Sequence, residues 1–272
     1  MSATSAIETM QHVRYRSFHQ GDCALSVGQS SADWIHIVSG LVASCGPSTG
    51  HKFGDLTLTG IFGPNSWILR ECSLAEEPVQ TQSDYICMTA TLAMFVPGAG
   101  ILSALKTDAG FSHHLVRIAF DDMQRLRRTL SYTRLAGADL RILIGLASLC
   151  AELDRAVSHP DYQGPDSDLT LPLSQVHMAS LLGVSRCIFS STANILSRAG
   201  WLRIHYGRLE FLGVRRWIFL HGIEMEIVEK MRSQTLLQVV DEVDHLSADL
   251  IQDASAKAPL APTKQSAGRV AL

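Results

Sequence analysis

The spacing of apolar residues changes along the chain and divides it into distinct parts. From residue 12 to about residue 97, apolar and polar residues alternate over short runs such as "DLTLTGIFGPNSWIL" and "DYICMTATLAMFV", and "DWIHIVSGLVAS" is an apolar run that Ser39-Gly40 interrupts. Glycine, proline, asparagine and serine interrupt these runs at short intervals. Short alternating runs between frequent turn signals are typical of antiparallel strands in a sandwich or barrel. We therefore expect a β domain in this part of the chain.

From about Ile101 onward the apolar residues recur every three or four positions. Phe111, Leu115, Ile118 and Leu126 fall on one narrow stripe, and the other faces are rich in arginine. This spacing predicts a long helix. A stripe this narrow is typical of a helix that pairs with a copy of itself, and the alternative is that the helix packs against its own domain.

A second helix is predicted over "GADLRILIGLASLCAELDRAV", and a polar loop separates it from an unusual stretch at residues 173–202. In that stretch, Ser174 can cap a short helix that runs to Leu182. Gly183 can supply a turn conformation that other residues resist. Ser185 can cap a second helix that Gly200 ends. Two short helices joined by a glycine-containing turn form a helix-turn-helix.

The next segment, "WLRIHYGRLEFLGV", predicts a small hairpin, so the helix-turn-helix is expected to carry a wing. In this motif the N-terminal half of the second helix enters the major groove of DNA. An arginine there can form a forked contact with a guanine, and small hydroxyl residues allow close approach to phosphates. The buried side of the second helix is expected to comprise Ile188, Ala193, Ile195 and Leu196. The candidate DNA contacts are Ser174, Ser185, Arg186, Cys187, Ser190, Ser191, Asn194, Arg203 and Arg208.

The charge distribution supports this interpretation. The whole chain carries a net charge of −3, whereas the segment from Ser174 to Leu220 has six arginines and one acid, Glu210, a local charge of +5. The sequence has no apolar run long enough to span a membrane and no apolar signal segment at its beginning, so we expect a cytoplasmic protein. No Ser/His/Asp arrangement, phosphate loop or metal motif is evident, so an enzyme is not expected.

Residues 12 to 220 resemble the CRP/FNR family of transcription regulators. The resemblance rests on "GQSSADWIHIVSGLVAS", on "GADLRILIGLASL", and above all on Gly183-Val184-Ser185-Arg186 within the helix-turn-helix. It implies an α+β fold that binds double-stranded DNA as a homodimer and works with RNA polymerase. The implied parts are a cupin-like β-roll that senses an effector at residues 12–105, a dimerisation helix at 106–136 and a winged helix-turn-helix at 137–220.

The DNA-reading helix departs from the family pattern at two positions. Arg186 matches the family arginine that contacts a guanine. The acidic residue that usually follows is Cys187 here, and the second family arginine falls at Ser191. An acid normally accepts from cytosine N4, so we expect a half-site that differs from the usual family sequence. Oxidation of Cys187 could also block DNA binding, which makes a thiol switch an open alternative.

The effector pocket departs further. Cyclic-nucleotide binders of the family use a Gly-Glu pair and an Arg-Ser or Arg-Thr pair, whereas the corresponding residues here are Arg70, Glu71, Thr81, Gln82 and Ser83. No arginine occurs between Glu71 and residue 116, so the pocket lacks the forked donor that a buried phosphate requires. Standard control by cyclic AMP is therefore not expected.

The six cysteines do not form a cluster typical of an iron–sulfur sensor, so no such cofactor and no metal site are expected. A different small effector, a protein partner or no ligand at all stay open. Haem also stays open, with formal axial candidates at His36, His51, Cys72, Cys87, His113 and His114.

Residues 221–272 form an extension beyond the usual end of the family. Apolar residues from Ile227 to Leu250 have helical spacing, and the polar tail after Ala254 is expected to be disordered. This segment has eight acids and five bases, so we do not expect it to bind DNA itself. It could pack on the winged domain, add a dimer contact or bind a partner.

Overall fold

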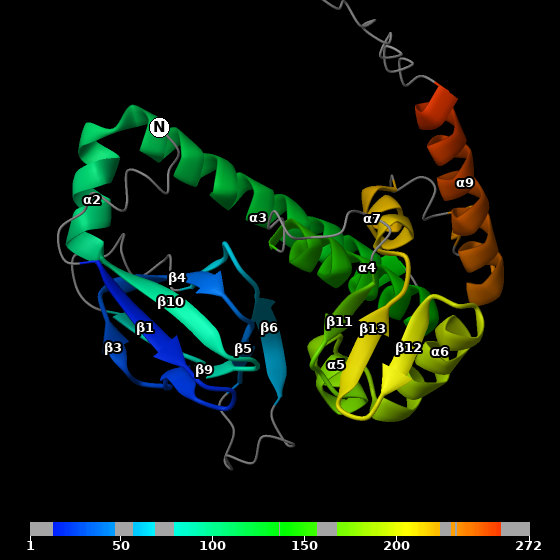
Figure 1. Ribbon diagram of the computed structural model, residues 1–272, viewed down its shortest axis with the longest axis horizontal. Coiled ribbons are helices and arrows are strands. Elements are labelled where there is room, and N and C mark those ends of the chain that lie inside the picture. The colour runs from blue at the N-terminus through cyan, green and yellow to red at the C-terminus, as the bar shows by residue number, and fades with distance from the viewer. Residues whose placement is uncertain are drawn as a thin grey trace, which may run out of the picture.

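The computed structural model describes residues 13–46, 57–68, 79–135, 137–156, 168–223, 230–231 and 233–256. Two lobes lie side by side, an N-terminal lobe of β-sheet and a C-terminal lobe that is mostly helical (Figure 1). A long helix, α3 (Ala109–Leu135), runs from the first lobe to the second. This is the α+β arrangement that the sequence predicts.

The N-terminal lobe contains antiparallel sheets. One sheet has the order β1 (Arg14–Phe18), β10 (Thr91–Pro97), β4 (Asp33–Ser39) and β7 (Trp67–Ile68). The second has the order β2 (Cys23–Leu25), β9 (Asp84–Cys87), β5 (Val42–Cys45) and β6 (Leu58–Phe62). A two-stranded ladder pairs β3 (Ser30–Ser31) with β8 (Val79–Gln80). The β domain expected from the alternating pattern is confirmed.

Alternate residues of β4 face different apolar clusters, as the period of a strand requires. Ile35 and Ile37 are fully buried and pack with Val42 of the second sheet. Trp34, on the other face, packs with Ile101 and Phe111. Those two residues belong to α2 (Gly98–Thr107) and α3, so the helices cover the outer face of the first sheet.

Helix α3 is only partly covered. The Asp108 side chain accepts a hydrogen bond from the Phe111 backbone N–H at 3.0 Å and separates α3 from α2. Beyond this first turn, Val116 is 53% exposed, Phe120 57% and Met123 39%. These three residues are spaced four and three positions apart and therefore share one face of the helix. The predicted stripe thus packs on its own domain at Phe111, and a neighbouring apolar face is left open.

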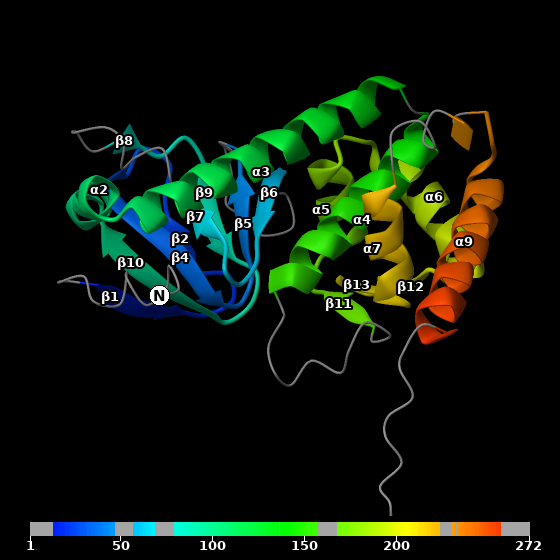
Figure 2. The same ribbon diagram turned by 90° about the horizontal axis from the view of Figure 1, so that it is seen from above.

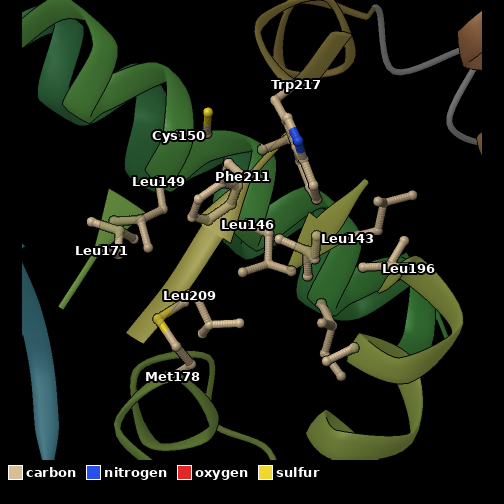
Figure 3. Close-up of a cluster of buried hydrophobic side chains, with 14 of the residues drawn as sticks. Leu143, Leu146, Leu149, Cys150, Leu171, Met178, Leu196, Leu209, Phe211 and Trp217 are labelled. Atoms are coloured by element: carbon tan, nitrogen blue, oxygen red, sulfur yellow. The ribbon is translucent and has the colours of Figure 1, made fainter. Parts of the chain in front are cut away.

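The C-terminal lobe surrounds an apolar core (Figure 3). Leu143 and Leu146 contribute to this core from its central helix, together with Leu196, Phe211 and Trp217 from the elements around it. The elements are α4 (Ala138–Ala156), β11 (Leu169–Leu171), α5 (Gln175–Leu181), α6 (Arg186–Arg198), β12 (Leu202–His205), β13 (Arg208–Phe211), α7 (Val214–Gly222) and α9 (Leu236–Ala256). The three strands form an antiparallel sheet in the order β11-β13-β12.

The C-terminal extension packs on the winged lobe. Leu236, Val239, Val240 and Val243 of α9 are all buried and belong to the same core as α4 and α6. Figure 2 shows α9 lying alongside α6 and α7. Of the three roles that the sequence leaves open, the structure therefore shows the first. The tail after residue 256 lies outside the described residues.

The two lobes touch through β6 and α5. The Leu58 backbone N–H donates to Ser180 Oγ at 2.9 Å. Cys45 and Leu58 of the second sheet also join the apolar core of the C-terminal lobe. The first helix of the helix-turn-helix is thereby attached to the β domain.

Candidate nucleic-acid interface

The ends of α5 and α6 have the capping residues that the sequence predicts. Ser174 Oγ accepts a hydrogen bond from the His177 backbone N–H, and Ser185 Oγ accepts one from the Ile188 backbone N–H, both at 3.3 Å. Gly183, in the turn between the helices, has a φ of +62°. A side chain is strained at that angle, which explains a glycine where helix propensity alone would oppose it.

The buried side of α6 differs in part from the prediction. Phe189, Thr192, Ala193 and Leu196 face the core. The prediction that Ile188 is buried was wrong, since its side chain is 42% exposed. Successive residues point about 100° apart around a helix, so only one of two neighbouring apolar residues can point at the core centre here. The larger Phe189 takes that place.

Helix α6 is fastened to the start of α4. Thr192 is completely buried, and its Oγ1 donates to Asp139 Oδ1 and, at 3.0 Å, to the Ile188 carbonyl oxygen. A buried hydroxyl without partners would be costly, so this pair favours one orientation of α6 on α4. That orientation sets which residues of α6 face outward.

The outward face of α6 carries most of the candidate DNA contacts. Cys187, Ser191 and Asn194 are exposed at helical spacing, and Arg186 is exposed in the first turn. Ser190 is half-buried. Arg198, which the candidate set does not include, lies on the same face as Ser191 and Asn194 because it follows them by seven and four positions. Helical spacing alone would have identified it.

The wing consists of β12 and β13 joined at Tyr206-Gly207. Tyr206 is fully exposed at its tip, and sequence reasoning did not single it out. Arg203 Nη1 donates to Glu210 Oε2 at 2.7 Å, and His205 Nε2 lies 3.2 Å from the same oxygen. The hydrogen bond with His205, supported by the Arg203 guanidinium, lowers the pKa of the Glu210 carboxyl. Arg203 is therefore paired, whereas Arg208 is exposed and forms no ion pair with any described residue.

A second arginine of the basic segment has a structural role. The Arg216 guanidinium donates to the Gly200 carbonyl oxygen, lies 4.9 Å from the centre of the Trp201 ring and meets Asp244 Oδ1 at 3.3 Å. Trp201 Nε1 donates to the other oxygen of Asp244 at 3.0 Å. Gly200 immediately follows the end of the α6 region, so α9 is tied to the junction between α6 and the wing. The net charge of the segment thus overstates the cationic surface that it presents.

Three of the five candidate effector residues lie within the described part of the chain. Arg70 and Glu71 lie outside the described residues. Thr81 is buried, and its Oγ1 donates to the carbonyl oxygens of Ser26 at 2.6 Å and Gln29 at 2.8 Å. Its hydroxyl therefore holds the loop before β3. Gln82 is exposed and Ser83 is half-buried.

The histidines and cysteines of the described β domain are not gathered into a metal site. In the ranges that the structure describes, no group of three His, Cys, Asp or Glu side chains could hold a metal ion. Burial lowers the pKa of His36, raises that of the Cys45 thiol to about 11 and raises that of Cys87. Both thiols are thus held in the protonated form at neutral pH. His51 and Cys72 lie outside the described residues.

None of the helices described is long and apolar enough to cross a membrane.

Comparisons with known proteins show a likeness in structure only. No family model matches the chain, and no curated protein matches it in sequence. FixK2 from Bradyrhizobium japonicum is 15% identical with a TM-score of 0.58, over 78% of this chain and 98% of FixK2. A CRP/FNR family transcriptional regulator from Thermus thermophilus is 16% identical with a TM-score of 0.55, over 77% of this chain and 99% of that protein.

The c-di-GMP responsive global regulator CLP of Xanthomonas campestris is 17% identical with a TM-score of 0.54, over 77% of this chain and 99% of CLP. In each case the likeness spans nearly the whole of the known protein and includes both lobes. The chain therefore has the fold of the CRP/FNR transcriptional regulators.

Proposed function

We propose that the chain is a sequence-specific DNA-binding transcription regulator that acts as a homodimer. The observation that carries the proposal is the outward face of α6. A helix-turn-helix with a wing presents Arg186, Ser191, Asn194 and Arg198 on one exposed surface. Phosphates attract such arginines, and base edges in the major groove can be read by these side chains.

The residues divide into base-reading and backbone-binding groups. Arg186 would bind a guanine, and Asn194 and Ser191 would contact neighbouring bases or the phosphates that line the groove. Cys187 and Ser190 lie in the same half of α6. Ser174 and Ser185, at the helix starts, would approach phosphates. On the wing, Arg208 would carry more of the backbone contact than Arg203, because Glu210 already pairs with Arg203.

The proposed dimer forms through α3. Val116, Phe120 and Met123 are exposed on one face of this helix, where a second copy would cover them. A parallel pair of α3 helices would bring two copies of α6 onto one side of the duplex. The two half-sites would then lie roughly 34 Å apart, one turn of DNA, as an inverted repeat.

If an effector controls this DNA binding, we propose that it is a small ligand other than cyclic AMP that acts on the β domain. CLP is described as c-di-GMP responsive, so proteins of this fold do respond to small ligands. The alternative function is a ligand-binding or redox-sensing module of the same fold, whose DNA binding requires an unidentified effector or a change of redox state, or is degenerate. RNA polymerase is the protein partner that this function implies.

The proposal is tested by selection of duplexes from a random pool by the purified protein without added ligand at moderate salt. Recovery of an inverted repeat with half-sites one helical turn apart would support the function and the dimer together. If neither the untreated protein nor protein treated with reductant, oxidant or cyclic nucleotides enriched any sequence, the proposed function would be refuted.

A further inference from the structure

Two exposed residues with little hydrogen-bonding capacity, Cys187 and Ile188, interrupt the polar surface of α6. Ile188 is 42% exposed, and the adjacent Cys187 is exposed as well. Both belong to the first turn of α6, beside Arg186. A free cysteine behaves as a small apolar side chain with weak hydrogen-bonding capacity. The two residues therefore offer shape and apolar surface, where the rest of the face offers hydrogen bonds.

The backbone around Ile188 is held firmly. Its N–H is bound by the Ser185 cap, and its carbonyl oxygen accepts from the buried Thr192. A β-branched side chain in a helix also has one strongly preferred rotamer. Ile188 is thus presented in a defined direction, and the core does not use it, because Phe189 fills the adjacent core position.

The major groove has one prominent apolar group that such a residue can recognise. Each base edge there presents hydrogen-bond donors or acceptors, and thymine adds a C5-methyl group. A side chain without hydrogen-bonding groups can select a base through that methyl group. The local excess of arginine over acid from Ser174 to Leu220 would bring DNA to this surface.

We propose that Ile188, with Cys187 beside it, contacts a thymine methyl group in each half-site and so specifies thymine next to the guanine read by Arg186. This inference rests on the proposed DNA-binding function. An acidic residue at position 187 would contact a cytosine. The proposed thymine contact takes the place of that cytosine contact and needs no charge.

The test replaces each thymine of the selected duplex with deoxyuridine, which removes the methyl group and keeps the base pair. One thymine position of the half-site should respond. Deoxyuridine at that position should weaken binding roughly fourfold when it is placed in one half-site and roughly fifteenfold when it is placed in both, as expected for losing one or two buried methyl contacts. I188A should bind the thymine and deoxyuridine duplexes equally. V176A is the matched control, because Val176 is 37% exposed on α5, and it should keep the wild-type ratio.

The outcomes separate this inference from the function on which it rests. A wild-type protein that binds every deoxyuridine duplex as tightly as the thymine duplex would overturn the inference and leave DNA binding intact. An I188A protein that unfolds at the wild-type temperature and still discriminates would also overturn it. Failure to recover any bound duplex would refute the proposed function and this inference with it.

Discussion

Replacing Asp244 should show whether α9 stabilises the winged lobe. Its carboxylate accepts from Trp201 Nε1 at 3.0 Å and meets Arg216 Nη1 at 3.3 Å. Trp201 is completely buried, and Asp244 is the acceptor of its indole N–H, so replacing Asp244 by alanine leaves this N–H without a protein partner at the edge of the core. The Arg216 guanidinium also holds the Gly200 carbonyl oxygen, which links this network to the end of α6.

The expected cost of D244A follows from these two contacts. A buried donor left without an acceptor costs about 1–3 kcal/mol. The ion pair with Arg216 is partly exposed, with side-chain exposures of 20% and 39%, so it adds about 0–1 kcal/mol. The free energy of unfolding should therefore fall by about 2 kcal/mol. D244N keeps an oxygen acceptor for Trp201 and should cost less than about 1 kcal/mol.

Urea unfolding followed by tryptophan fluorescence, at one fixed chain concentration, measures these differences. The matched control is D241A, because Asp241 is exposed on the same helix and its replacement carries the same gain in helix propensity. D241A should stay within about 0.5 kcal/mol of the wild type. If D244A and D241A unfold at the same urea concentration, α9 does not hold the α6–wing junction in the way described.

Three further predictions concern the DNA contacts, the dimer and the wing. R186A should lose discrimination at one base pair, whereas R208A should weaken binding to all duplexes and reduce the dependence of affinity on salt. Equal losses of affinity for specific and random DNA in R186A would contradict its role. If the proposed dimer forms through α3, F120E should be a folded monomer in sedimentation equilibrium, because Phe120 is exposed in the single chain and its replacement should not unfold the protein. A mass equal to that of the wild type would exclude this face as the dimer contact. The pKa of Glu210 is lowered in the fold, so its stabilising contribution is complete above about pH 4.3, the unfolded value, and is lost as the pH falls through the lowered folded value. The stability advantage of the wild type over E210Q should therefore shrink in acid, and a constant difference between pH 7 and pH 3 would contradict the pairing.

The helix-turn-helix was predictable because its signals are local. Ser174 and Ser185 act as caps through residues three positions away, and Gly183 supplies an angle that its own turn requires. The apolar run of β4 likewise reflects burial on both faces of a single strand, with Trp34 on one face and Ile35 and Ile37 on the other. Such features depend on neighbouring residues, so a pattern in the sequence can reveal them.

The remaining features depend on tertiary contacts. Ile188 and Phe189 are both apolar, and only the packing of α6 on α4 decides which one is buried. The pairing of Arg216 with Asp244 spans 28 positions, so the charge count could not reveal that this arginine is occupied. The apolar spacing of α9 predicts that one face of the helix is covered, but it does not reveal whether its own domain or a partner covers that face.

The ratio of affinities for specific and non-specific DNA is the most direct test of the central claim. The wild-type protein should bind its selected inverted repeat at least about 10³ times more tightly than a scrambled duplex of the same composition at physiological salt. Fluorescence anisotropy with both duplexes gives this ratio in one titration series. Equal affinity for the two duplexes would contradict the account of α6 as a sequence-reading helix.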